Sequence, residues 1–517
     1  MLRTKRYVTF EIVDAAGIVS AEFEGFRLAN KALPGDFVKA ADSGEGCELV
    51  KRRAHPPLVG ILEFTNTMKF GYTSRGIPVY RFIPHDTSYP SFLVGSKEKY
   101  TDNQLAIVRF DEWTTTTFPR GGLQEILGPC GVESLELQAL ALQYSPWEWT
   151  RKRCPANLVL PELGGRRAIS ATTINIDPPG CRDIDDVLSL WQNSDSTWTL
   201  AISIADVAEL LRLNPELHFA AQIGQTLYEE GRAVRPLFET GITESILSLE
   251  ADGIARPAVT LFATWNGSSL SGYEWCETVV QTTRSYTYED CGNYEHVDVL
   301  KAIASHILGF PTPDSHKWIE ALMLLYNSQA AEVLKSRGEG ILRIHSEPDV
   351  AKLERYKYIG LPAEELAYPA AVYCSATSPE AGRGHWGLQY GSYCHASSPI
   401  RRFADCVNQT ILKAAIRNHP TPQLPQSIEA YADSLNSLGK LAKKYERDVF
   451  LVKKILSKSA STQLEGIIAD VGKVYVYEWK RIVSVEEAII PGTEVNVEYY
   501  VNTKERSWKS RILFALR

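Results

Sequence analysis

Apolar and polar residues alternate in short runs over the first 145 residues of the chain. The runs at 7–13, 58–64 and 105–110 follow the two-residue period of half-buried β-strands, and turn-forming residues separate them. Short strands with regular turns are typical of small barrels of the oligonucleotide-binding (OB) type. The same pattern returns after residue 464, which predicts a further small barrel there.

Two segments follow the period of an α-helix instead. Residues 318–335 are apolar on nearly every side, which predicts a buried helix in which Glu320 needs a polar partner. Residues 426–458 carry an apolar stripe at alternating spacings of three and four, which predicts a long helix with one buried face. The stripe consists of Ile428, Tyr431, Leu435, Leu438, Ala442, Tyr445, Val449 and Val452.

The composition is that of a globular protein with several domains. The chain has 517 residues, 44% of them hydrophobic and 23% charged, and this length suggests three or four domains. No run approaches the ~18 apolar residues of a membrane span, and the N-terminus has no apolar signal core. The nine cysteines form no C-x-x-C pair, so we expect neither a zinc site nor a disulfide framework, and an intracellular, reducing compartment follows.

Charge and aromatic residues bear on contact with nucleic acid. A net charge of −7 argues against a protein that coats DNA, but an internal channel needs only a local positive lining. Aromatic residues in the second set of strands are candidates to stack on bases, although most strand aromatics belong to a core. These candidates are Phe70, Tyr72, Tyr80, Phe82 and Tyr89.

Four carboxylates fall within ten residues in the middle of the chain. Asp177 follows a run rich in β-branched residues, and a Pro-Pro-Gly turn separates it from Asp183, Asp185 and Asp186. The turn folds the segment back, so these side chains are expected to approach one another. Crowded carboxylates repel unless a cation lies among them, and hard oxygen ligands with open positions suit magnesium. The pattern predicts metal-assisted attack of water on a phosphodiester. The alternative is a solvated acidic turn, and the spacing of an EF-hand is absent.

A second block of polar residues lies at 393–405. Ser398 is expected to cap a helix that Pro399 opens, so that backbone N–H groups and the guanidinium groups of Arg401 and Arg402 face an anion. A phosphate beside the aspartates is the expected occupant. The alternative is a capped helix with a pair of surface arginines.

These blocks resemble a known family. Residues 177–186 read D-P-P-G-C-R-D-I-D-D, which resembles the signature of the ribonuclease II/R (RNB-domain) exoribonucleases and is most similar to the exosome exoribonuclease subunit type. Residues 393–405 are similar to the family block H-F-T-S-P-I-R-R-Y-A-D, and residues 341–348 match L-L-R-x-H-x-x-P. Residues 29–38 resemble part of the family's first cold-shock barrel.

The resemblance implies a multidomain α/β fold. A mixed α/β RNB catalytic domain would be flanked by two N-terminal cold-shock OB barrels and one C-terminal OB barrel. The implied domains are the barrels at 1–56 and 57–150, the catalytic domain with its linker and long helix at 151–461, and the last barrel at 462–517.

The resemblance also implies an activity. It is magnesium-dependent, processive 3′-to-5′ hydrolysis of single-stranded RNA to nucleoside 5′-monophosphates, in RNA degradation or processing. Asp177, Asp183, Asp185 and Asp186 would form the magnesium site, and Asp185 would also orient or deprotonate the attacking water. Arg401 would stabilise charge in the transition state.

Further residues are assigned to RNA by the resemblance. Tyr228 would clamp the 3′ end by stacking, which needs its ring and not its hydroxyl, so that phenylalanine should replace it without effect; a core ring is the alternative. Tyr288 would contact a nucleotide at the 3′ end, and Glu320 would contact a ribose hydroxyl. His345 is expected to position other groups more than to react. Ser398 and Arg402 would contact phosphate.

Some positions depart from the family pattern or leave it open. The chain begins at the first barrel, without the endonuclease domain of the exosome subunit, so we expect a free-standing monomer and no exosome-like ring association. Ser203 stands where many relatives carry His, which concerns the rate and not the reaction class. Asp206 is a candidate for a further metal ligand or for a structural hydrogen bond.

Two other functions compete with exoribonuclease activity. A catalytically inactive RNB-family RNA-binding regulator should have lost an aspartate or Arg401, and both blocks are complete. A deoxyribonuclease fits the three barrels and Glu320 less well. The expected partner is single-stranded RNA and not a membrane. The expected location is cytoplasmic, with the nucleus left open.

Overall fold

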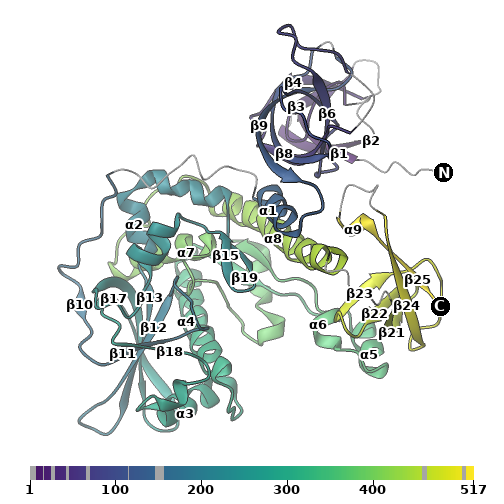
Figure 1. Ribbon diagram of the computed structural model, residues 1–517. Helices are drawn as coiled ribbons and strands as arrows, with labels where there is room; N and C mark the ends of the chain where they lie inside the picture. Colours follow the sequence, from purple (N-terminus) through teal and green to yellow (C-terminus); the bar gives the residue numbers. More distant parts are fainter. Residues whose placement is uncertain are drawn as a thin grey trace. The chain divides into compact units, whose positions relative to one another are not determined.

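The computed structural model describes most of the chain, in two compact units (Figure 1). The units are residues 1–149 with 443–517, and residues 150–442. The predicted domain boundaries at 150 and 461 lie outside the described residues. The described residues are 7–14, 17–24, 29–41, 46–65, 70–114, 116–145, 157–456, 463–502 and 508–517.

The described residues of the first unit form three small sheets. One has the strand order β2-β1-β3-β4, the second is a closed barrel in the order β5-β6-β7-β9-β8, and the third has the order β23-β22-β21-β24-β25. The strands are β1 Tyr7–Asp14, β2 Gly17–Glu24, β3 Phe37–Ala40, β4 Cys47–Lys51, β5 Leu58–Glu63, β6 Val79–Pro84, β7 Phe92–Gly95, β8 Gln104–Glu112, β9 Arg120–Pro129, β21 Gln463–Asp470, β22 Lys473–Val476, β23 Arg481–Ser484, β24 Glu494–Val501 and β25 Ile512–Leu516. The unit also contains α1 (Glu133–Tyr144) and α9 (Trp508–Arg511). The closed barrel agrees with the strand pattern of this part of the sequence.

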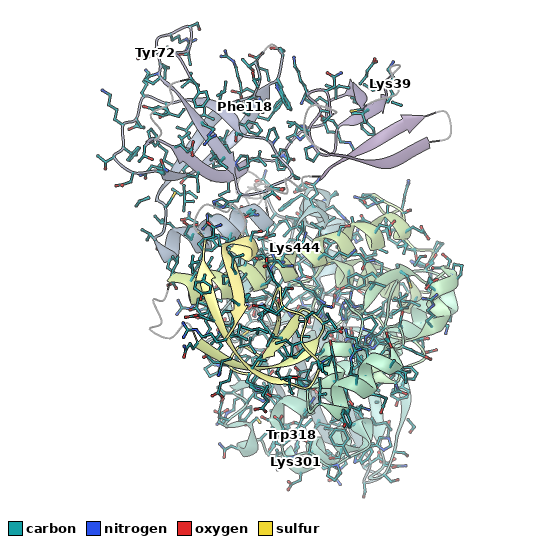
Figure 2. All side chains as sticks on the ribbon, turned by 90° about the vertical axis from the view of Figure 1, so that its right-hand side faces the viewer. Lys39, Tyr72, Phe118, Lys301, Trp318 and Lys444 are labelled. Carbon is teal, nitrogen blue, oxygen red and sulfur yellow. The ribbon has the colours of Figure 1, made fainter. Side chains whose placement is uncertain are left out.

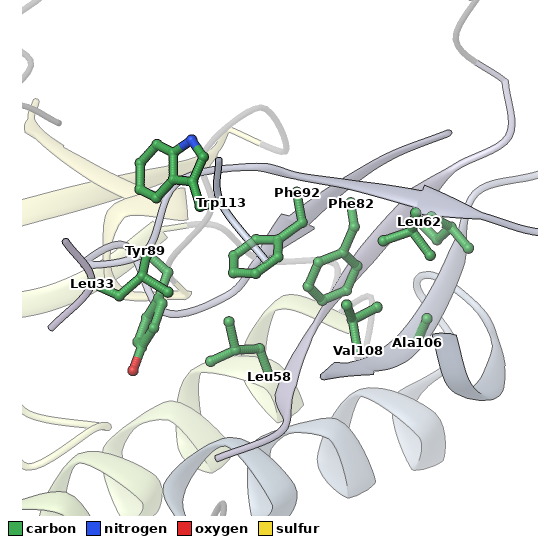
Figure 3. Close-up of a cluster of buried hydrophobic side chains, with 10 residues drawn as sticks. Leu33, Leu58, Leu62, Phe82, Tyr89, Phe92, Ala106, Val108 and Trp113 are labelled. Carbon is green, nitrogen blue, oxygen red and sulfur yellow. The ribbon is translucent and has the colours of Figure 1, made fainter. Parts of the chain in front are cut away.

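A cluster of buried side chains fills the closed barrel (Figure 3). Phe82 and Phe92 are both fully buried, and their rings meet edge to face with centroids 6.3 Å apart. Tyr89 is 6% exposed in the same cluster, so Phe82 and Tyr89 are core rings and not base-stacking rings. Tyr72 is 66% exposed and remains a candidate for contact with a base.

The second unit is organised around a seven-stranded sheet in the order β10-β17-β16-β13-β12-β11-β18. Its strands are β10 Arg167–Ala168, β11 Thr173–Ile176, β12 Asp186–Gln192, β13 Trp198–Ala205, β16 Arg256–Trp265, β17 Leu270–Val280 and β18 Arg284–Tyr286. Two hairpins lie outside this sheet, β14 Leu227–Glu229 with β15 Arg232–Arg235, and β19 Ile341–Ile344 with β20 Val372–Ser375. The helices are α2 Val207–Leu213, α3 Val297–Leu308, α4 Ser315–Arg337, α5 Val350–Tyr358, α6 Ala363–Ala367, α7 Phe403–Ile416 and α8 Ile428–Leu456, and α8 continues past residue 442 into the first unit. A mixed α/β domain with barrel-like sheets is the predicted fold class.

Both predicted helices are present, as α4 and α8. Asp314 caps α4 by accepting the N–H of His316 at 3.0 Å, and Gly338 ends it in the left-handed conformation (φ 65°). Lys301 of α3 lies over the ring of Trp318 in α4, 5.3 Å from its centroid (Figure 2). None of the described helices combines the length and apolar character that crossing a membrane requires.

Candidate active site

The connection between β11 and β12 carries the four aspartates. All residues of β11 are buried, and β11 pairs antiparallel with β12 and parallel with β18. Asp177 directly follows β11, where its N–H donates to the carbonyl of Tyr286 at 3.1 Å. The turn reverses the chain with Gly180 at a φ of 81°, and Asp186 begins β12. The predicted return of the chain is therefore present, because neighbouring antiparallel strands bring both ends of the connection together.

These aspartates share an environment of negative charge. Burial raises the pKa of Asp177, and the charge of Asp183 raises it further. Burial and then the charge of Asp177 raise the pKa of Asp186 to about 7. Arg401 is the cation that opposes both shifts. Crowded carboxylates of this kind gain from a bound cation, and an all-oxygen donor set fits magnesium.

A tighter acidic group lies elsewhere in this unit. Among the described residues, the oxygens of Asp206, Glu209 and Glu277 lie within 4.8 Å of one another, and the aspartates of the β11–β12 connection do not gather so closely. The ammonium group of Lys413 pairs with all three acids, so the protein supplies its own cation there. Asp206 also caps α2 by accepting the N–H of Glu209 at 3.1 Å, which is the structural role left open for it.

Asp185 joins the two sequence blocks. Its side chain is 5% exposed, and its Oδ1 accepts the N–H of Ile400 at 2.8 Å. Its Oδ2 lies 3.4 Å from Nε of Arg401. Burial raises the pKa of Asp185 well above its ordinary value, against the lowering effect of Arg401. The carboxylate of Asp185 is therefore held by Ile400, which lies 215 residues further along the chain. It lies beside the guanidinium of Arg401 and in the same loop as the other aspartates.

The block from Ser398 to Arg402 is a turn and not the start of a helix, which corrects the expectation that Pro399 opens one. The carbonyl of Ser398 accepts the N–H groups of Arg401 (3.3 Å) and Arg402 (3.0 Å), and α7 begins only at Phe403. The Ser398 hydroxyl does not cap a helix, because it accepts Nη2 of Arg401 at 2.9 Å.

Asp405 in the first turn of α7 explains this geometry. It is fully buried, and its Oδ1 accepts the N–H of Ser398 at 2.8 Å. Arg402 donates to both of its carboxylate oxygens at 2.9 Å. The chain therefore wraps around Asp405, so that Arg402 faces inward while Arg401 keeps 44% of its side chain exposed. Asp405 was not among the predicted site residues, although an arginine and an aspartate three residues apart are a recognisable helical pair.

The structure brings Tyr228 into the aspartate cluster. The segment before β14 pairs with the turn formed by Ser398–Arg402, called the arginine turn below. The N–H of Thr226 donates to the carbonyl of Arg401 at 2.9 Å. The Tyr228 hydroxyl donates to Oδ2 of Asp183 at 2.7 Å. The hydroxyl thus has a partner that the sequence did not indicate, and the expectation that phenylalanine replaces Tyr228 without effect no longer stands.

Tyr288 and Glu320 occupy different surroundings. The Tyr288 ring stacks on His316 with centroids 3.8 Å apart. Burial raises the pKa of Tyr288, as do the charges of Asp177 and Asp186, so its hydroxyl lies within their field. Glu320 is exposed and pairs with Lys317 at 2.6 Å, so the expectation that Glu320 is buried is wrong. The polar side of α4 faces solvent there.

His345 is held through both ring nitrogens. Its Nε2 lies 2.8 Å from the carbonyl of Pro369, and its Nδ1 accepts the N–H of Gly387 at 3.1 Å. His345 directly follows β19 in the chain, and it is 8% exposed. A ring with both nitrogens engaged fits the positioning role, because neither nitrogen is left to exchange a proton with substrate.

Ser203 takes part in a buried chain of hydroxyl groups. Thr260 donates to Ser203 at 2.7 Å and lies 2.6 Å from the hydroxyl of Thr278. Replacing Ser203 by alanine should lower the free energy of unfolding by about 1 kcal/mol, since Thr260 loses one of two partners. Denaturant unfolding would measure this, with exposed Ser268→Ala as the control. A slower cleavage rate at unchanged stability would contradict a purely structural role.

The fold and the site together define an α/β protein with small β-sheets, of which one in the described residues is a closed barrel, and with a carboxylate-rich site suited to a metal ion and a phosphodiester. The model of the RNB domain matches residues 166–297 and 296–418, and that of the Dis3-like cold-shock domain 2 matches residues 79–145. The chain therefore contains an RNB domain, as the resemblance indicated.

Curated relatives agree with this assignment. Ribonuclease R of Vibrio cholerae is 24% identical over 85% of this chain and 65% of its own length. The exosome complex exonuclease dis3 of Schizosaccharomyces pombe is 22% identical over 71% of this chain and 49% of its own length. The chain spans about half the length of the curated relatives it matches.

Two solved structures share the fold. Mycoplasma genitalium RNase R, in complex with ribose-methylated single-stranded RNA, matches 99% of this chain and 100% of its own with a TM-score of 0.74 and 14% identity. Yeast Ssd1, described as a pseudonuclease, matches 96% of this chain and 82% of its own with a TM-score of 0.66 and 14% identity. At such identities the likeness concerns the fold alone.

Proposed function

We propose that the protein is a magnesium-dependent exoribonuclease that hydrolyses single-stranded RNA processively from its 3′ end to nucleoside 5′-monophosphates. The observation that carries the proposal is the pairing of Asp185 with the Ile400 N–H and Arg401, beside three further aspartates. The names of the curated relatives, ribonuclease R and exosome exonuclease, support the same activity.

Each side chain has a distinct part in this proposal. Asp177, Asp183 and Asp186, together with Asp185, would hold the magnesium ion. When bound, magnesium neutralises phosphate charge and makes water a better nucleophile. Asp185 Oδ2 accepts a proton from the attacking water while the water oxygen bonds to phosphorus. The bond between phosphorus and the 3′-oxygen breaks, and that oxygen leaves with the electron pair and takes a proton from solvent.

Charge and contact complete the assignment. Arg401, the exposed member of the arginine pair, stabilises the charge that grows on the phosphate oxygens. Ser398 lies beside that phosphate, and Arg402 supports the turn from behind. Tyr228 and Tyr288 contact the terminal nucleotides, and Glu320 a ribose hydroxyl. His345 positions the surface on which the RNA lies. Action as a monomer in the cytoplasm, outside an exosome-like ring, stays a prediction.

A digest of matched RNA and DNA oligomers, with magnesium or with EDTA, tests the proposal. Magnesium-dependent shortening of 5′-labelled RNA from its 3′ end, with 5′-monophosphates released and DNA intact, is the expected result. Cleavage of both oligomers would indicate a general phosphodiesterase. RNA binding without any cleavage would indicate an inactive regulator.

The inactive regulator is the second candidate, because the fold resembles that of the pseudonuclease Ssd1. Exoribonuclease activity is favoured over this candidate, because all four aspartates and Arg401 are present and Asp185 contacts the arginine turn.

Tyr228 variants separate two roles of that side chain. Removal of the hydroxyl in Tyr228→Phe should raise the magnesium concentration needed for half-maximal cleavage about tenfold, because residues that hold a metal ligand typically matter by ~10–100-fold. The length of the limit fragment should not change, since the ring remains. Tyr228→Ala should show the same magnesium defect and also leave longer limit fragments, because base stacking contributes ~1–3 kcal/mol per base.

Magnesium titrations and gel-resolved end products would measure both effects. Tyr294→Phe is a matched control, since that tyrosine is also buried and no hydrogen bond joins its hydroxyl to an aspartate among the described residues. Uniform slowing of Tyr228→Ala with a lower melting temperature and an unchanged limit product would instead identify Tyr228 as a core ring.

A further inference from the structure

Arg343 in β19 carries a guanidinium group whose charge no carboxylate balances among the residues described. It lies over the ring of Tyr373 in β20, with Cζ 4.5 Å from the ring centroid. No ion pair joins it to an acidic side chain in the described part of the chain. The residue is half-buried, and burial lowers its pKa, as does the neighbouring charge of Arg402. A desolvated and unbalanced cation costs free energy unless an anion joins it.

Neighbouring arginines differ from Arg343 in this respect. Arg402 makes two hydrogen bonds to Asp405, and Arg401 lies 3.4 Å from Asp185. Burial lowers the pKa of His395, and so do the charges of Arg402, Arg343 and Arg401, so all three guanidinium groups act on the same ring. The side of the site next to the arginine turn is therefore positive, and Arg343 supplies the charge that remains uncompensated.

The position of Arg343 is set before any ligand binds. Its N–H donates to the carbonyl of Tyr393 at 2.8 Å. The Tyr373 hydroxyl lies 2.8 Å from Nδ1 of His395, which holds the ring that supports the guanidinium. A planar fork held over a fixed ring loses little freedom on binding, and its geometry matches two oxygens of a phosphate.

We propose that Arg343 binds a backbone phosphate of single-stranded RNA, next to the phosphate that Arg401 faces. The identity of the ligand rests on the proposed function. Arg343 then acts in binding and register, whereas Arg401 acts on the reacting phosphate. Arginine stacked on a tyrosine and free of a carboxylate suits an internucleotide phosphate, because a single negative charge balances it.

The first test measures RNA binding without turnover, in the Asp185→Asn background with EDTA. Arg343→Gln should weaken binding of a single-stranded oligomer about 10- to 100-fold, since hydrogen bonds to charged groups are strong. The slope of log affinity against log salt should decrease by about 0.7, as expected for one lost phosphate contact on a single strand. Arg337→Gln is the control, because Arg337 is neutralised by Glu339 at 3.1 Å; its affinity and salt slope should not change.

The second test locates the phosphate. Oligomers with one neutral methylphosphonate linkage, placed in turn at each of the last linkages, should reveal one position that weakens binding when Arg343 is present. Arg343→Gln should be insensitive to that position and should respond to the others like the parent. Arg343→Lys should keep the salt slope and lose part of the affinity. If Arg343→Gln fails to fold in a melting measurement, Arg343→Lys takes its place in the scan, with a reduced penalty at the same linkage.

Equal affinity and salt slope for Arg343→Gln and its parent would overturn the inference. A methylphosphonate penalty that the Arg343 variant shares at every linkage would overturn it too, because Arg343 would then sense no particular phosphate. These measurements involve no cleavage. A protein that binds RNA through Arg343 without cutting it would refute the proposed function and leave this inference intact.

Discussion

Replacing Asp185 by asparagine should lower the rate of RNA cleavage about 10²- to 10⁴-fold, the range expected for loss of a general base. Asparagine keeps the size of the side chain, and its carbonyl oxygen can still accept the N–H of Ile400. The lost charge faces Arg401, so the attacking water loses its proton acceptor and the guanidinium loses a partner. RNA binding should stay near the level of the unmodified protein, because the other arginines and the tyrosines remain.

Single-turnover cleavage of a 5′-labelled oligomer, beside binding measured in EDTA, would check this result. Asp298→Asn is a matched control, since the Asp298 side chain is 94% exposed and lies on α3. Near-normal cleavage by Asp185→Asn would show that the proton acceptor is another group.

Replacing Arg401 by lysine should lower kcat about 10²- to 10³-fold with little change in KM, since a donor used in the transition state is typically worth ~3–4 kcal/mol. Lysine keeps the charge but loses the planar fork, so it cannot contact the Ser398 hydroxyl and approach Asp185 at the same time. Steady-state kinetics on a short oligomer would separate the two constants.

Arg402→Lys provides the contrast for this experiment. Arg402 is bonded to the buried carboxylate of Asp405, so its substitution should lower the melting temperature as well as the rate. A defect of Arg401→Lys that lies entirely in RNA affinity would assign Arg401 to binding and remove it from the chemistry.

The local features of the site were predictable because they depend on neighbouring residues. β-branched residues favour the strand that ends before Asp177, and a Pro-Pro-Gly turn reverses the chain whatever surrounds it. The turn alone brings Asp177 and Asp186 to neighbouring strands. The helical periods of α4 and α8 are local in the same sense, because side chains three and four positions apart share a face.

The prediction of a helix at the arginine turn was wrong because it rested on local preference alone. A serine followed by proline is a common helix start, and local preference points to one here. The buried carboxylate of Asp405 outweighs that preference, because it must bond to the Ser398 N–H and to Arg402 once it is removed from water. Glu320 was expected to be buried, because its neighbours in sequence are apolar, but it is exposed and pairs with Lys317. The apolar residues around it do not determine which side of α4 meets solvent.

The sequence by itself determined the family, the turn that gathers the aspartates and the presence of a facing arginine block, because these follow from short strings of residues. Only the tertiary structure decided that Asp185 meets Ile400, that Tyr228 donates to Asp183, that Lys413 fills the second acidic group and that Arg343 is left without a carboxylate. Each of these depends on which strands and helices pack together across up to 215 residues. Burial then sets the outcome, because a charge removed from water must find a partner wherever the fold provides one.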